Sequence, residues 1–346
     1  MNFTVCQNCV MDDSDPDISF DKGICNYCRE YPEKERIRKI EKTNLPWVYN
    51  TIRKEGKGKK YDCLLGLSGG VDSSMCLYNL IENGIRPFAF TVDNGWNTKE
   101  SDENIMRLVE GMKVPFFRYN IDLEVFGNLQ SAFLQSGTAN VEIPTDHLLT
   151  AASYEMASEN NIRTIISGGN MATESIMPKA WGYQPRDLFH VKAIYRIFNE
   201  KELTNLPTVS IWQYLYYRFV KKIRIINLLD YYEYNREESK KLLNEKFGWK
   251  DYGEKHYEST FTWWFQAYYL YTKFGYDKRK PHYSSMILSK QMTRSEAMER
   301  LLERPIYPEL GIEQKVLKYP SKTYKDYPNQ EWLWNLLSKI YGHLKI

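Results

Sequence analysis

The residues best suited to chemistry form a short loop between an apolar run at 63–67 and a helical pattern. They are Ser68, Gly69, Gly70, Val71, Asp72, Ser73 and Ser74. Two adjacent glycines let the backbone approach a ligand closely and turn its amides toward it, and the start of a helix adds partial positive charge. The loop therefore suits an anion such as a phosphate chain. It lacks the Gly-x-x-x-x-Gly-Lys-Ser/Thr spacing of a Walker A loop, so ordinary γ-phosphoryl transfer is not indicated.

Four of the six cysteines form two Cys-x-x-Cys pairs, Cys6 with Cys9 and Cys25 with Cys28. The spacing is typical of a zinc site, because each pair places two thiolates on a tight knuckle and two knuckles complete a tetrahedral shell. Four sulfur ligands leave no open position for water, so we expect a structural Zn²⁺ in a ribbon too short to build its own core. Disulfides and an iron–sulfur cluster are the alternatives.

Strand and helix patterns alternate after the loop. Strand candidates lie at 62–67, 87–92, 116–121 and 163–167, and helical spacing recurs at 71–81, 105–112 and 145–160. This alternation predicts an α/β fold, a doubly wound parallel sheet covered on both faces. The ligand of such a sheet lies at the carboxyl ends of the strands, which singles out the loops at 68–74, 93–96 and 167–170.

The loop at 68–74 resembles the PP-loop of the ATP pyrophosphatase families, which include GMP synthetase, NAD synthetase, tRNA thiolases and asparagine-synthetase-type amidotransferases. The resemblance implies a PP-loop, adenine nucleotide alpha hydrolase-like fold that binds ATP and Mg²⁺. It also implies a reaction in which ATP is cleaved between its α and β phosphates. A substrate oxygen becomes adenylylated, and a nucleophile then displaces AMP.

The same resemblance implies roles for residues in the three loops. Asp72 is expected near the metal and the pyrophosphate and to act in catalysis with Ser73. Lys192 is expected to be the catalytic cation near the nucleotide, because it follows the third loop within a short stretch, 186–196. His147 and His190 are further candidates for proton transfer. The predicted ATP-binding residues are Ser68, Gly69, Gly70, Asp72, Ser73, Ser74, Asp93, Gly168, Gly169 and Asn170. Asp93 has an equal alternative as a turn former.

Four regions follow from these patterns. We expect a zinc ribbon at 1–32, a charged helical linker at 33–60, the PP-loop ATP-binding domain at 61–198 and a mainly helical, aromatic-rich substrate or partner region at 199–346. Capping-box spacing at 235–238 and 293–296 predicts two helix starts in the last region.

Three cations, Arg279, Lys280 and His282, cluster in a predicted loop of the C-terminal region. Convergent cations could hold a carboxylate or a diphosphate of the substrate there, which makes these residues the substrate-binding candidates. A solvated loop is the alternative.

The cysteine ribbon, the two glycine-rich loops and the segment 280–297 together resemble the N-acetyl sugar amidotransferases of lipopolysaccharide and pseudaminic-acid pathways, over nearly the whole chain. The resemblance implies conversion of a sugar acetamido group to an acetamidino group. Adenylylation lets the amide oxygen leave as AMP, and ammonia attacks the activated imidate carbon. The sequence leaves open whether the sugar is UDP-linked, CMP-linked or free.

The source of ammonia is expected to be a separate glutamine-hydrolysing partner. An N-terminal glutaminase needs a cysteine exposed after Met1, but residue 2 is Asn2. The spacing of His256 and Glu258 suits a triad, yet neither Cys63 nor Cys76 occupies a sharp turn. We therefore expect no glutaminase activity in this chain.

A tRNA thiolase is the main alternative, because some of those enzymes also join a cysteine ribbon to a PP-loop. Sulfur transfer normally needs cysteines beside the nucleotide, but none follows Cys76, and Cys63 and Cys76 are expected to be apolar filler. The net charge of +3 gives no footprint typical of a nucleic-acid-binding protein. A non-catalytic nucleotide sensor is a third reading.

Hydropathy gives no membrane signal. No apolar run approaches the ~20 residues of a membrane span, and the first residues lack a charged start followed by an apolar stretch. We expect a soluble, cytoplasmic protein with no membrane partner.

Overall fold

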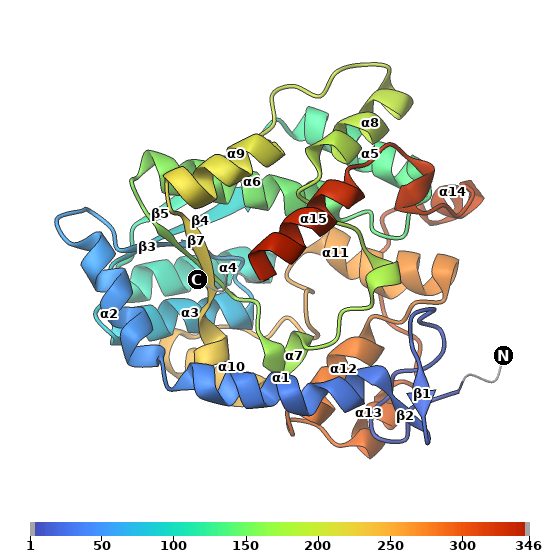
Figure 1. The fold of residues 1–346 in the computed structure, drawn as a ribbon, viewed down its shortest axis with the longest axis horizontal. Helices are drawn as coiled ribbons and strands as arrows, with labels where there is room; N and C mark the ends of the chain where they lie inside the picture. The colour runs from blue at the N-terminus through green and yellow to red at the C-terminus, as the bar shows by residue number, and fades with distance from the viewer. Residues whose placement is uncertain (1–3, 343–346) are drawn as a thin grey trace.

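The computed structural model describes residues 4–342 and so leaves out Asn2. It contains a five-stranded parallel sheet, which lies in the left half of the molecule in Figure 1. The strand order is β5-β4-β3-β6-β7, and all neighbouring strands are parallel. The strands are β3 (Cys63–Gly66), β4 (Pro87–Asp93), β5 (Phe116–Asn120), β6 (Thr164–Ser167) and β7 (Arg224–Asn227). The predicted doubly wound α/β fold is therefore confirmed. The order reverses between β3 and β6, whose carboxyl ends frame the crevice in which such sheets bind ligands.

Strand β7 comes from the region that the sequence pattern marks as helical. It has four residues and pairs only with β6, with Ile225 opposite Ile165. The sheet thus continues past residue 198, where the sequence places the end of the ATP-binding domain.

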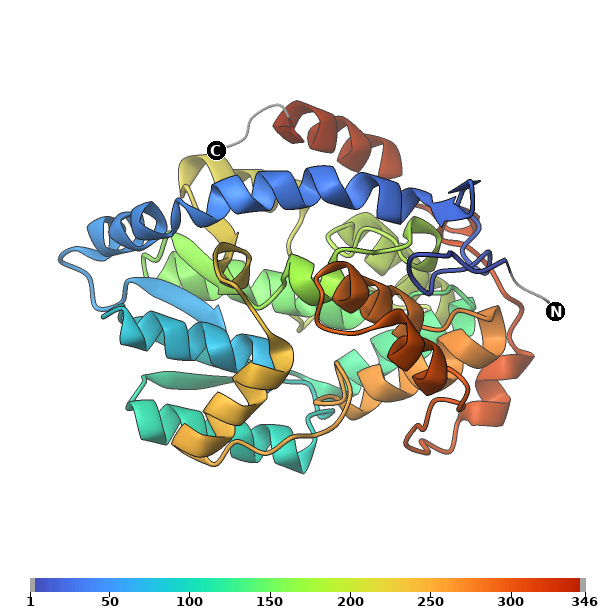
Figure 2. The same cartoon turned by 90° about the horizontal axis from the view of Figure 1, so that it is seen from below.

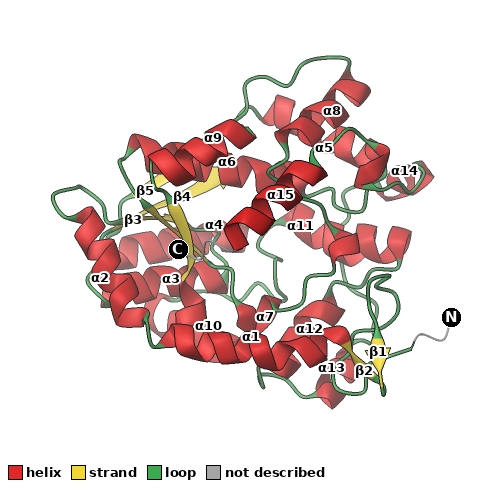
Figure 3. Ribbon diagram, viewed as in Figure 1, coloured by secondary structure: helices red, strands yellow, loops and turns green. Residues whose placement is uncertain are grey.

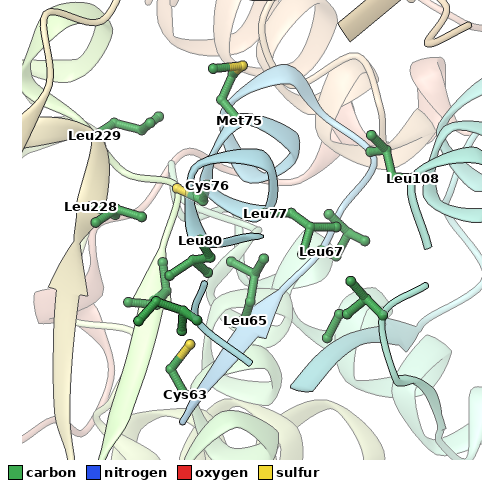
Figure 4. Packing of buried hydrophobic residues seen from close by; sticks show 14 of the residues in the cluster. Cys63, Leu65, Leu67, Met75, Cys76, Leu77, Leu80, Leu108, Leu228 and Leu229 are labelled. Carbon is green, nitrogen blue, oxygen red and sulfur yellow. The ribbon is translucent and has the colours of Figure 1, made fainter. Parts of the chain in front are cut away.

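Helices cover both faces of the sheet. Leu64 and Leu65 are neighbours on β3, and their side chains belong to two different buried clusters. Helix α3 (Val71–Glu82) packs on the Leu65 side, where the apolar side chains fit between helix and strand (Figure 4). Helix α6 (Ile143–Glu159) packs on the Leu64 side. The other helices of this part are α4 (Lys99–Met112) and α5 (Leu123–Ser136).

The N-terminal part is a small hairpin followed by two helices. The hairpin consists of β1 (Phe20–Asp21) and β2 (Ile24–Cys25), and α1 (Asn26–Lys42) and α2 (Leu45–Gly56) follow. Helix α1 runs from the hairpin along the molecule to α2, which lies beside the sheet (Figure 2). The helical linker thus starts inside the ribbon, because Cys28 already belongs to α1.

The rest of the chain is mainly helical, as expected (Figure 3). Asn235 and Thr293 cap the helices that the sequence predicts after them. The α-helices are α7 (Met171–Glu174), α8 (Leu188–Asn199), α9 (Ile211–Leu215), α10 (Arg236–Phe247), α11 (Thr260–Trp264), α12 (Arg279–Leu288), α13 (Arg294–Arg300), α14 (Glu313–Lys318) and α15 (Glu331–Gly342). Short 3-10 helices are η1 (Lys179–Trp181), η3 (Leu228–Tyr231) and η5 (Tyr324–Asp326), and π-helices are η2 (Tyr216–Val220) and η4 (Phe265–Phe274). Among the described residues, no helix is both long and apolar enough to span a bilayer.

Candidate active site

The loop at 68–74 joins β3 to α3 at the carboxyl edge of the sheet. Gly69 has φ of +77°, and a Cβ there would lie 2.2 Å from the carbonyl oxygen of Ser101, so only glycine fits. The loop is fastened internally: the amide of Ser68 donates to Ser73 Oγ (3.2 Å), and Ser74 Oγ donates to the Gly70 carbonyl (2.7 Å). Two of the predicted serines therefore shape the loop.

The loop at 168–170 lies directly against the first one. A Cβ on Gly168 would lie 3.1 Å from the amide nitrogen of Ser73. Asn170 turns its side chain into the start of α7, where it accepts a hydrogen bond from the amide of Thr173 (3.0 Å). A Cβ on Gly169 would lie 3.7 Å from Glu174 Oε2. The structure thus brings two of the three predicted loops together.

Asp72, on the first turn of α3, is held by two side chains from distant parts of the sequence. Lys255 Nζ donates to Asp72 Oδ2 (2.6 Å), and the hydroxyl of Tyr234 donates to Asp72 Oδ1. Lys255 also contacts Thr173 Oγ1 (2.7 Å) and Glu174 Oε1 (3.0 Å). Lys255, and not Lys192, is therefore the cation beside the loop.

The segment 249–258 covers the loop at 68–74. Trp249 Nε1 donates to the Gly69 carbonyl (3.0 Å), and the amide of Val71 donates to the hydroxyl of Tyr252 (3.2 Å). The amide of Thr98 donates to the carbonyl of Glu258 (3.0 Å). A phosphate bound by the Val71 amide would therefore replace the hydroxyl of Tyr252.

His256 joins two carboxylates at the end of this covering segment. Its Nε2 lies 3.4 Å from Glu174 Oε1, and its Nδ1 lies 3.9 Å from Glu258 Oε1. Its φ is +69°, in the left-handed region that non-glycine residues rarely adopt. Burial opposes protonation, but the two carboxylates raise the pKa of His256 to about 9. The imidazole is therefore a cation at neutral pH.

A cavity of about 450 Å³ opens beside these groups. The carboxyl edge of the sheet, α6, the segment 174–182 and the C-terminal region contribute to its wall. The lining residues are Ser68, Thr91, Val92, Asn94, Asn97, Asn140, Glu142, Thr145, Asp146, Leu149, Glu174, Met177, Pro178, Trp181, Gly182, His256, Glu258, Ser259, Thr262, Phe265, Gln266, Leu270, Lys278 and His282. The wall thus combines carboxylates, cations, amides and aromatic rings.

Charges of both signs lie in this wall. Burial lowers the pKa of Lys278, and burial together with the cations His256, Lys278 and Lys255 lowers the pKa of His282 well below its usual range. His282 is therefore neutral at neutral pH. Burial acts to raise the pKa of Glu174, but the neighbouring cations, above all Lys255, hold that pKa well below its usual value. Glu174 is therefore ionised.

Lys192 does not reach the site. It is exposed on α8, which packs against α5, and it is absent from the cavity wall. The expectation that Lys192 lies near the nucleotide rests on its closeness to the third loop along the sequence. In the structure α8 lies beside α5, apart from the strands (Figure 1). The carboxylate of Asp93 accepts a hydrogen bond from the amide of Gly95 (3.2 Å) and lies 3.4 Å from Arg118. Asp93 therefore acts as a turn former, the alternative that the sequence also allows. Its neighbour Asn94 lines the cavity instead.

Two of the histidine candidates have structural contacts. His147 Nδ1 lies 2.8 Å from the carbonyl of Pro185, and the amide of Val209 donates to His147 Nε2 (3.3 Å). His190 Nδ1 lies 3.1 Å from the carbonyl of Pro328. Burial lowers the pKa of both histidines, so both are neutral.

The expected loop at 279–282 is the first turn of helix α12. Arg279 pairs with Asp277 (2.7 Å), and Lys280 pairs with Asp12 of the ribbon. Of the three predicted substrate-binding residues, only His282 lines the cavity, and the neighbouring Lys278 lines it too. The turn of about 100° per residue separates Lys280 from the other two, and Asp277 takes up the guanidinium of Arg279.

The four N-terminal cysteines form a site that could hold a metal ion. Their Sγ atoms all lie within 4.8 Å of one another, with 3.8 Å from Cys6 to Cys28 and 3.7 Å from Cys9 to Cys25. A tetrahedral shell with Zn–S bonds of about 2.3 Å has edges of about 3.8 Å, so the donors fit zinc. The amide of Asn8 approaches Cys6 Sγ (3.4 Å), as expected for a metal-binding knuckle.

Sequence reasoning missed the covering segment with Lys255, His256 and Glu258 as part of the nucleotide site. The sequence gives only a weak signal for this segment, namely the two-residue spacing of His256 and Glu258. No motif near these residues indicates that they lie close to Asp72. The contacts that hold this segment over the loop, from Trp249 to Gly69 and from Val71 to Tyr252, join residues far apart in the sequence.

Comparisons with known proteins bear on one wall of the cavity. Residues 258–319 match the family model of the C-terminal domain of LPS biosynthesis protein WbpG-like proteins. This segment contributes Glu258, Thr262, Lys278 and His282 to the wall. An uncharacterized protein from Methanocaldococcus jannaschii is 34% identical over 105 residues, which cover 29% of this chain and 36% of the relative. The match thus spans about a third of that relative.

Two solved structures match part of this chain. An NH3-dependent NAD synthetase from Campylobacter jejuni has 17% identity and a TM-score of 0.29, over 38% of this chain and 57% of that chain. An NMN synthetase from Francisella tularensis has 14% identity and a TM-score of 0.32, over 66% of this chain and 94% of that chain. The similarity of this chain to WbpG-like LPS biosynthesis proteins is thus carried by residues 258–319, which match the C-terminal domain of that family.

Proposed function

We propose that the chain is an ATP-dependent amidotransferase, a C–N ligase that releases AMP and pyrophosphate. It adenylylates the acetamido oxygen of an N-acetylated sugar and replaces that oxygen with ammonia to give an acetamidino group, for surface polysaccharide or flagellin glycan synthesis. The supply of ATP suggests that it acts in the cytoplasm.

One observation carries the proposal. The glycine-rich loop, with Asp72 held by Lys255, lies next to a cavity that has both charged and aromatic walls. A loop without a Walker lysine suits cleavage that leaves pyrophosphate in the amide cradle. The adjoining cavity offers room for a sugar beside the α-phosphate. The family of the C-terminal segment supports a substrate from lipopolysaccharide synthesis.

Cationic and anionic residues of the site have different proposed roles. Amides of the loop and the start of α3 would hold the pyrophosphate, and Lys255 and His256 would stabilise the charge that develops as it leaves. Mg²⁺ commonly binds one or two carboxylates together with substrate phosphates, so Asp72 and Glu174 fit that ion. Bound Mg²⁺ neutralises phosphate charge. The segment 249–258 would exclude water, which would otherwise hydrolyse an adenylylated intermediate.

The ribbon is proposed to bind zinc for structure alone, because four thiolates fill its shell. It is joined to the active-site region through Arg294, which donates to the carbonyls of Cys6 and Cys9 (both 3.0 Å). The amide of Val10 also donates to Ser284 Oγ on α12 (3.2 Å).

The tRNA thiolase reading receives no support from the remaining cysteines. Cys63 and Cys76 are fully buried in the core, and burial raises the pKa of both thiols. Neither is available as a thiolate carrier of sulfur.

Ammonia is proposed to come from a separate glutamine-hydrolysing partner. The ring of His256 faces Glu174, Glu258 and His282, and none of the described cysteines contacts it. A glutaminase triad therefore has no nucleophile there.

The test measures the fragments of ATP. The purified chain should release AMP and pyrophosphate with ammonium and one of a panel of acetamido sugars: N-acetylmannosamine, UDP-N-acetylglucosamine and CMP-N-acetylneuraminate. Unmodified tRNA with a sulfide donor serves as the comparison. Release of orthophosphate alone, or AMP formation only with tRNA, would refute the proposal.

A further inference from the structure

A carboxyl pair in the cavity has no role in the steps described so far. Glu142 directly precedes α6, and Asp146 follows one turn later. Both line the cavity, Glu142 with only 7% exposure and Asp146 open to the cavity space. Glu142 accepts a hydrogen bond from Thr262 Oγ1 (3.2 Å), and Asp146 has no ion-pair partner within the described residues.

We propose that Glu142 and Asp146 bind ammonium in the cavity and take up its protons when nitrogen attacks the activated substrate. The inference rests on the proposed amidotransfer reaction.

Unsatisfied acceptors beside the pair point to a ligand with N–H donors. Thr145 is 9% exposed, and its hydroxyl, like Glu258 Oε2, is a buried polar atom without a hydrogen-bond partner in the described structure. The hydroxyl of Thr145 lies near enough to Glu142 to lower the pKa of that carboxyl, but it does not make a hydrogen bond of normal geometry. Buried polar groups seldom stay unpaired, and both residues line the same cavity. Ammonium carries four N–H donors and matches such a wall.

The acid–base properties of the pair suit proton uptake. Burial, together with the charge of Asp146, raises the pKa of Glu142 to about 8. Burial in the cavity wall raises the pKa of Asp146 to about 6, although His256 and Lys278 oppose this shift. Groups that titrate near neutral pH transfer protons most effectively.

The step balances with two protons and two carboxylates, both ionised when ammonium lies against them, because a neighbouring cation favours the charged form of a carboxyl group. Ammonium gives one proton to a carboxylate and becomes ammonia, whose lone pair forms the new C–N bond to the imidate carbon. The C–O bond to AMP breaks, and its electron pair leaves with AMP. The attached nitrogen gives up a second proton to the other carboxylate. The imidate nitrogen keeps the proton of the original amide throughout, so the product is an amidinium, whose positive charge would lie against the same two carboxyl groups.

A binding measurement tests the site without turnover. Acetamidinium chloride, a mimic of the product group, is titrated into the full chain by calorimetry, against sodium chloride of equal ionic strength. We expect binding that weakens at least about tenfold in Glu142→Gln and Asp146→Asn, because each loses a charged acceptor. Thr145→Val keeps both carboxyl groups and should weaken binding about fivefold. Glu159→Gln, an exposed change on the same helix, is the control.

A kinetic measurement then separates proton uptake from structural support. Ammonium-dependent product formation should fall about 10²-fold in the two carboxyl variants. Hydroxylamine is already unprotonated at neutral pH, so the same variants should lose much less activity with it. Absence of acetamidinium binding, or equal binding by all variants, would overturn the inference. Normal binding without AMP formation from any sugar would instead overturn the proposed reaction and leave the cation site standing.

Discussion

Replacement of Lys255 by methionine should reveal the cost of leaving its two carboxylates unpaired. Lys255 Nζ lies 2.6 Å from Asp72 and 3.0 Å from Glu174, and the lysine side chain is only 10% exposed. Removing one partner of a buried ion pair costs about 3–5 kcal/mol, because the remaining charge stays poorly solvated. Asp72 and Glu174 keep 17% and 24% exposure, so we expect the lower end of that range, about 3 kcal/mol at neutral pH.

The loss should depend on pH with a defined sign. Burial would raise the pKa of Glu174, but Lys255 above all holds it well below 4.5. A folded pKa below the unfolded one contributes stability that is present above the unfolded pKa, about 4.3, and lost as pH falls through the folded value. Lys255→Met and wild type should therefore differ most at neutral pH and converge in acid. Urea unfolding followed by tryptophan fluorescence at several pH values measures this difference.

The same substitution should lower kcat for AMP formation about 10²–10³-fold, because it removes a charge beside the departing pyrophosphate. Lys240→Met is the matched control. Lys240 is 12% exposed and contacts Glu237 (3.2 Å) and Asp251 (2.9 Å), but those carboxylates are 61% and 50% exposed. Its loss should cost less than about 1 kcal/mol and leave turnover unchanged. Equal destabilisation by both changes, or a pH-independent loss in Lys255→Met, would refute the reasoning.

Three further predictions concern the ribbon, the histidine and the loop. Cys25→Ser should abolish retention of one zinc per chain, measured by metal analysis after dialysis, and should speed hydrogen exchange in α12, onto which the ribbon docks. His256→Gln should lose about 2 kcal/mol of unfolding free energy at acidic pH. Because the pKa of His256 is raised to about 9, this contribution is full below about 6.5 and fades as pH rises through 9, so denaturant curves should converge in alkali. Gly69→Ala should abolish ATP binding in a filter assay, because the added Cβ meets the Ser101 carbonyl; unchanged binding would contradict the tight-turn argument.

Features that depend on neighbouring residues were predictable from the sequence. The cysteine spacing predicted a cluster of four close thiols, and the glycine pair predicted a loop between β3 and α3. The hydrophobic pattern predicted four of the five strands of the parallel sheet. In each case the structural feature is formed by the same few consecutive residues that carry the sequence pattern. Tertiary packing therefore seldom changes the predicted feature.

Features that depend on docking between distant segments were not predictable. Lys255 reaches Asp72 only because Trp249 and Tyr252 fasten the covering segment over the loop. Lys192 is near the third loop in sequence, but its helix packs on α5. Arg279 pairs with the neighbouring Asp277, and Lys280 pairs with Asp12 of the distant ribbon, so neither faces a substrate.

The cavity wall draws on segments spread from Ser68 to His282 along the chain. During synthesis on the ribosome, the strands and the loop emerge well before the part that covers them. The capacity to bind both reactants is therefore an all-or-none property of the finished polypeptide: a product cut short between β7 and Tyr234 would still carry the sheet, yet without the partner groups of Asp72 or the far wall it would have nowhere to hold a second reactant.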